Sequence, residues 1–157
     1  MTRMDNAGPL FAEAGVAPAS PRGKVMLRWA GYTMIAIGLL HIAVLGMDAL
    51  PLLGGWASGV LWTTDHWQPV ASQAHDVVVN NAAFHATVGS FAGPVIVFGV
   101  VVLWMDRRDV TPPAFLGWGL GVWALLASLI MEPSGYPLGL IPAVLLILAA
   151  RRGAAST

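Results

Sequence analysis

The stretch WAGYTMIAIGLLHIAVLGM, residues 29–47, is long, apolar and free of formal charge. It is bounded by Arg28 before it and by Asp48 after it. An α-helix rises about 1.5 Å per residue, so about 20 apolar residues are needed to cross a hydrocarbon core about 30 Å thick. A stretch of this length and composition predicts a helix that spans a membrane.

Later runs along the chain have the same character and predict further spans. Including the first, the spans are expected at about 29–47, 82–105, 112–131 and 135–150. An outer loop at about 48–81 separates the first two of them, and its tryptophans are expected to lie at headgroup depth. The sequence therefore predicts an all-α membrane protein, a bundle of four transmembrane helices.

Composition agrees with a surface that faces lipid. Hydrophobic residues make up 57% of the chain and charged residues 10%, whereas a soluble domain of this size carries about 25% charged residues. The chain contains no cysteine. This excludes disulfide frameworks, thiolate metal sites and cysteine nucleophiles.

Basic residues predict how the spans are oriented. All of them lie outside the predicted spans, at Arg3, Arg22, Lys24, Arg28, Arg107, Arg108, Arg151 and Arg152. With four spans, every one falls on the same side of the membrane, and cytoplasmic segments are enriched in Lys and Arg. Both ends of the chain are therefore predicted to be cytoplasmic. Residues 1–24 are expected to form a disordered cytoplasmic tail and residues 25–152 the membrane domain.

Small residues recur at helical spacing within the spans, where close backbone approach holds membrane helices together. The positions expected to pack helices are Gly31, Gly38, Gly89, Gly93, Gly117 and Gly121. Pro94 follows the GxxxG pair at 89 and 93 and is expected to kink the second span. These stripes predict a tight assembly, either within one chain or as a homo-oligomer.

Two histidines lie inside predicted spans, His41 and His85, and Glu132 ends the third span. Ionisable residues at membrane depth are costly, so a functional role is the first hypothesis. If the small-residue faces form the interior, all three groups converge there. Three interpretations stay open: purely structural hydrogen bonding, a binding or proton-relay site for a small amphipathic ligand or ion, and ligation of a metal or haem by the histidines.

Three stretches together resemble a family of small bacterial membrane proteins of unknown function. They are WAGYTMIAIGLLHIAVLG at 29–46, LWMDRR at 103–108, and FLGWGLGVWALLASLIMEPSGYPLGLIPAVLLIL at 115–148. The most specific parts are Gly-x-x-His, from Gly38 to His41, and the Pro-Ser-Gly turn, from Pro133 to Gly135. The resemblance implies a four-helix, multi-pass protein of the bacterial cytoplasmic membrane, and it implies no activity and no cofactor.

No catalytic signature is present, and a non-enzymatic role is preferred. The leading hypothesis is a small-ligand binding, transport-accessory or stress-related module that uses His41, His85 and Glu132. The alternative is a haem- or quinone-linked oxidoreductase subunit, and haem enters only there. The expected partner is the lipid bilayer. No nucleic-acid contact is expected, because the net charge is zero and the cytoplasmic segments are short.

Overall fold

A computed structural model describes residues 21–131 and 134–154. The described residues form helices and short 3₁₀ turns, and no strands occur among them. The α-helices are α1 (Pro21–Ala49), α2 (Leu53–Ala57), α3 (His75–Ala86), α4 (Ala92–Arg107), α5 (Ala114–Ile130) and α6 (Leu140–Ala154). The 3₁₀ turns are η1 (Leu50–Leu52), η2 (Asp65–Trp67), η3 (Val70–Ser72) and η4 (Tyr136–Gly139). The all-helical prediction is confirmed for this part of the chain.

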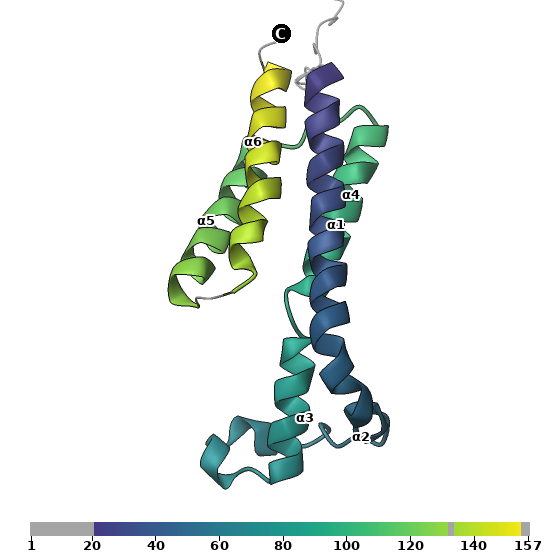
Figure 1. Ribbon diagram of the computed structural model, residues 1–157, viewed down its shortest axis with the longest axis vertical. Helices are drawn as coiled ribbons and strands as arrows, with labels where there is room; N and C mark the ends of the chain where they lie inside the picture. The colour runs from purple at the N-terminus through teal and green to yellow at the C-terminus, as the bar shows by residue number, and fades with distance from the viewer. Residues whose placement is uncertain (1–20, 132–133, 155–157) are drawn as a thin grey trace, which may run out of the picture.

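The four long helices lie side by side in the order α5, α6, α1, α4 (Figure 1). The extensive packing is between α1 and α4, between α1 and α6, and between α5 and α6. Although α4 and α5 follow one another in the chain, they share no such packing. In the described residues the four long helices of the predicted bundle thus form an open row.

Helix α1 supplies the centre of the core. Leu27, Ala30 and Met34 recur every three or four residues, so they share one face, and all three are buried. They pack with Val102 of α4 and with residues of α6, including Leu146. Since α1 contacts a partner on each side, it joins the α5–α6 hairpin to α4.

Glycine lets the backbones of neighbouring helices touch. A Cβ placed on Gly99 would lie 2.7 Å from the carbonyl oxygen of Gly31. At the same α1–α4 contact, a Cβ placed on Gly38 would lie 2.8 Å from the carbonyl oxygen of Ala92. Between α5 and α6, a Cβ on Gly117 would lie 2.9 Å from the carbonyl oxygen of Ala143. A Cβ on Gly121 would make an ordinary van der Waals contact.

The predicted span at 82–105 is not one helix, because the chain leaves the helical conformation between Thr87 and Phe91. Gly89 lies in this linker, where a Cβ would meet the ring of Phe84, and a Cβ on Gly93 would meet open space. The GxxxG pair therefore forms no interhelical seam in the described structure. This corrects the packing expected for these two glycines.

Pro94 marks the start of a helix instead of a kink within one. It is the third residue of α4, and the first N–H groups of a helix have no intrahelical partner. The missing N–H of proline therefore costs nothing at this position. The predicted outer loop at 48–81 also changes, since α3 already begins at His75.

Two helical segments are long and apolar enough to cross a membrane, Pro21–Ala57 and Tyr136–Gly153, and Ala114–Ile130 is a shorter apolar helix. By length and composition, these two segments are candidate membrane spans. Helix α1 begins at Pro21, four residues before the predicted boundary of the membrane domain. The remainder of the predicted tail, residues 1–20, lies outside the described residues.

The molecule has two distinct ends. The start of α1 and the ends of α4 and α6 lie together at the top of Figure 1, and they carry every Lys and Arg of the described residues. We call this the basic end. At the other end, α3 and α2 project beyond the turn that joins α5 to α6 (Figure 1).

Candidate functional site

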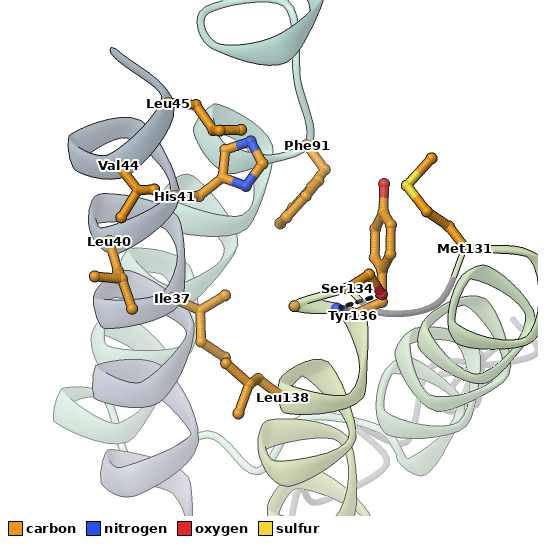
Figure 2. A pocket seen from close by; sticks show the side chains of 11 residues that line it. Ile37, Leu40, His41, Val44, Leu45, Phe91, Met131, Ser134, Tyr136 and Leu138 are labelled. Carbon is orange, nitrogen blue, oxygen red and sulfur yellow. Dashed lines mark hydrogen bonds between the residues drawn. The ribbon is translucent and has the colours of Figure 1, made fainter. Parts of the chain in front are cut away.

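A cavity of about 470 Å³ lies between α1 and the turn that joins α5 to α6, at the end of the hairpin away from the basic end. Figure 2 shows its walls, which come from α1, from Phe91 and from the segment around η4. The lining residues are Ile37, Leu40, His41, Val44, Leu45, Phe91, Met131, Ser134, Gly135, Tyr136 and Leu138. We call this cavity the His41 pocket.

His41 is fixed by a bond to another helix. Its Nε2 lies 3.0 Å from the carbonyl oxygen of Ala86, the last residue of α3. A carbonyl oxygen only accepts, so Nε2 carries the hydrogen and donates it. The carbonyl groups of a final helical turn have no intrahelical partner, and His41 satisfies one of them. In its neutral form the ring therefore has Nδ1 as an acceptor.

Aromatic rings continue from His41 across the pocket. The ring centroids of His41 and Phe91 are 4.6 Å apart. Phe91 also contacts Trp123 of α5 at 5.5 Å and Tyr136 of η4 at 5.4 Å. The rings of Trp123 and Tyr136 meet edge to face at 5.5 Å. This cluster connects the α3–α4 linker to the α5–α6 hairpin.

The pocket combines apolar walls with few polar atoms. Leucine, isoleucine, valine and methionine side chains supply most of its lining. Nδ1 of His41 has no hydrogen-bond partner among residues 21–131 and 134–154. The hydroxyl of Tyr136 rises along the opposite wall (Figure 2). A cavity of this size and character accommodates a small molecule with an apolar body and one hydrogen-bonding group.

The predicted cluster does not assemble as expected. His85 is exposed and lines a different cavity, together with Trp56 and Trp62. His85 lies on α3, which the linker at residues 87–91 separates from α4. Glu132 lies outside the described residues. Within those residues, no group of three or more His, Asp or Glu side chains could hold a metal ion.

Sequence reasoning missed the partners of His41. Tyr136 directly follows the Pro-Ser-Gly turn that the sequence singles out, a signal that could have found it. Phe91 had no such signal, because it was predicted to lie within an unbroken helix. Its position against His41 depends on the linker between α3 and α4.

Comparison with known proteins adds a family and no activity. The model of a family described as "Family of unknown function (DUF6463)" matches residues 26–153. This confirms the resemblance to an uncharacterised family. No curated protein and no solved structure matches the chain.

Proposed function

The chain belongs to this family of unknown function, and we propose that it is a four-span membrane protein that binds a small amphipathic molecule in the His41 pocket. The spans are α1, α4, α5 and the η4–α6 segment. Both ends of the chain lie in the cytoplasm, and the His41 pocket lies in the outer half of the bilayer. The cavity beside His41 and Tyr136 is the observation on which the binding proposal rests.

Exposed apolar side chains support the placement in lipid. In the two candidate spans, only 11% and 28% of the most apolar window is buried within the chain, whereas the core helix of a soluble protein is mostly buried. Large apolar residues on α5 are exposed as well, among them Trp118, Val122 and Leu129. Soluble monomers rarely expose contiguous apolar patches of more than a few hundred Å².

Helix lengths and charge support four spans. Helix α5 has 17 residues and α4 has 16, so at about 1.5 Å per residue they are about 25 Å long, close to a hydrocarbon core of about 30 Å. Helix α1 has 29 residues and extends beyond that thickness. The basic residues gather at one end, and the positive-inside rule assigns that end to the cytoplasm.

The pocket favours a ligand that partitions into the membrane. A hydrogen-bond donor on the ligand would reach Nδ1 of His41, and an acceptor would reach the hydroxyl of Tyr136. Leu40, Val44 and Leu138 would contact its apolar part. A polar group removed from water in this setting needs such partners, because an unpaired one is costly.

Photolabelling of the full chain in liposomes tests this binding. The probe is a long-chain alcohol with a diazirine on its tail, and the unlabelled alcohol is the competitor. We expect saturable labelling of the peptides that contain His41 and Tyr136. Tyr136→Phe should weaken competition about five-fold through the loss of one hydrogen bond. His85→Ala is the matched control and should change nothing, because His85 lines another cavity. Labelling that excess alcohol does not reduce would sink the proposal.

Of the two forms of the oxidoreductase alternative, haem-linked and quinone-linked, the quinone-linked form still fits the pocket. A quinone is an amphipathic molecule with hydrogen-bonding oxygens, so its chemistry fits the same pocket. The bis-histidine haem form loses support, because His41 and His85 line separate cavities. A short-tailed benzoquinone that competes with the alcohol probe more strongly than the alcohol itself would favour this alternative.

A further inference from the structure

A further cavity lies between α1 and α4 at the basic end. Its volume is about 230 Å³, and it is lined by Arg28, Tyr32, Leu103, Asp106 and Arg107. None of these residues lines the His41 pocket. The cavity therefore belongs to a separate place on the molecule, at the opposite end of α1.

Asp106 holds the guanidinium of Arg28 in one orientation. The Nε–H of Arg28 donates to Oδ2 of Asp106 at 2.7 Å. The Asp106 side chain is only 5% exposed, whereas the Arg28 side chain is 57% exposed. A guanidinium has five N–H donors in a planar fork, and this bond uses one. In the described part of the chain, the terminal amino groups of Arg28 donate to no protein group.

The charges around this cavity favour an anion. Asp106 compensates the charge of Arg28, and the exposed Arg107 adds a second positive charge. Tyr32 contributes a hydroxyl. A planar, pre-oriented guanidinium suits a phosphate, which accepts two parallel N–H bonds from it.

Aromatic residues place the cavity at headgroup depth. Tyr32 lines it, and the exposed Trp29 and Trp104 are the sequence neighbours of the lining residues Arg28 and Leu103. Trp and Tyr are enriched at the membrane–water interface, where lipid phosphates lie. Leu103 adds an apolar wall that suits the glycerol and upper acyl part of a lipid. This depth rests on the membrane placement in the proposed function.

We propose that this cavity binds the phosphate of an anionic phospholipid of the cytoplasmic leaflet. Arg28 and Arg107 contact the phosphate, and Tyr32 lies beside it. Asp106 is a positioning residue that acts through Arg28. Basic pockets between transmembrane helices on the cytoplasmic side are suited to such headgroups.

Native mass spectrometry of the detergent-purified chain tests the site, with phosphatidylglycerol as the probe and phosphatidylcholine as its comparison. We expect tighter binding of phosphatidylglycerol, weakened about five-fold by Arg107→Gln, since one arginine is removed. Arg28→Lys keeps the charge and loses the fork, and it should also weaken binding. Arg108→Gln is the matched control: Arg108 is adjacent in sequence but packs over Trp104 and does not line the cavity.

Asp106→Ala separates positioning from simple charge. It raises the net positive charge, so charge alone would tighten binding of phosphatidylglycerol, whereas loss of the Arg28 orientation should weaken it. Tighter binding in this variant, or equal binding of both lipids, would overturn the proposal. Displacement of the lipid by millimolar inorganic phosphate would reassign the cavity to free phosphate. Alkaline washing of membranes checks insertion separately, so a chain that does not insert contradicts the proposed function instead.

Discussion

Gly31 and Gly99 bring α1 and α4 so close that each glycine lies against the other's backbone. A Cβ on Gly99 would lie 2.7 Å from the carbonyl oxygen of Gly31, and one on Gly31 would lie 3.0 Å from that of Gly99. Backbone atoms cannot move aside as a flexible side chain can. In the proposed membrane placement, apolar burial between helices drives little, so close backbone contact of this kind becomes an important source of attraction.

Gly99→Ala should therefore lower the free energy of unfolding by about 1–3 kcal/mol, the usual cost of overpacking. Gly93→Ala is the control on the same helix. A Cβ there meets open space, and alanine is the better helix former by about 1 kcal/mol. Thermal unfolding in detergent should show a lower midpoint for the first variant and an equal or higher midpoint for the second. Equal losses in both would contradict the seam.

Spacing within one helix predicts which face is small but not what that face meets. Gly31 and Gly38 share a face by their spacing of seven, and the structure places both against α4. Gly99 was missed, because nothing in its own helix marks it as the residue opposite Gly31. The bond between Arg28 and Asp106 was missed for a similar reason, although these opposite charges flank two predicted spans on the same predicted side.

The break between α3 and α4 places Phe91 against His41 in the His41 pocket, and it was not predicted. The apolar pattern continues through residues 82–105, so hydropathy gives no sign of a break. The carbonyl oxygen of Phe84 accepts N–H groups from both Thr87 and Gly89, which closes α3. The partner of the last carbonyl of this turn, that of Ala86, is His41 of α1, and a contact so distant in sequence cannot be predicted from local residues.

His41 links the two helices at this break, because it donates to the carbonyl oxygen of Ala86. His41→Phe keeps a ring against Phe91 and removes that donor. We expect hydrogen exchange in the last turn of α3 to become about five-fold faster, because one hydrogen bond is lost. Exchange in α5 should not change, which provides the internal control. Unchanged exchange in α3 would show that its end needs no support from α1.

At the scale of the whole molecule, four spans require the α1–α3 connection and the C-terminus to lie on opposite sides of the membrane. The chain has no cysteine, so single cysteines report on exposure without background. A Cβ on Gly54 meets nothing within 4 Å, which makes Gly54→Cys a harmless reporter. In intact cells, a membrane-impermeant maleimide should label Gly54→Cys and should label Thr157→Cys only after permeabilisation. Labelling of both in intact cells would refute the topology.

The apolar surface itself permits a test with opposite outcomes in lipid and in water. Val122 lies near the middle of α5 and is 53% exposed. If lipid covers this face, an aspartate at the centre of a span costs about 3 kcal/mol, so Val122→Asp should reduce the amount of chain that resists alkaline extraction from membranes. Val70→Asp is the control, because Val70 is 68% exposed in η3, outside the proposed spans. Its effect should stay within about 0.5 kcal/mol, as for an ordinary surface substitution. In water, both substitutions would be equally mild. A membrane yield that Val122→Asp leaves unchanged would therefore remove α5 from the bilayer, and with it the hairpin that forms one wall of the His41 pocket.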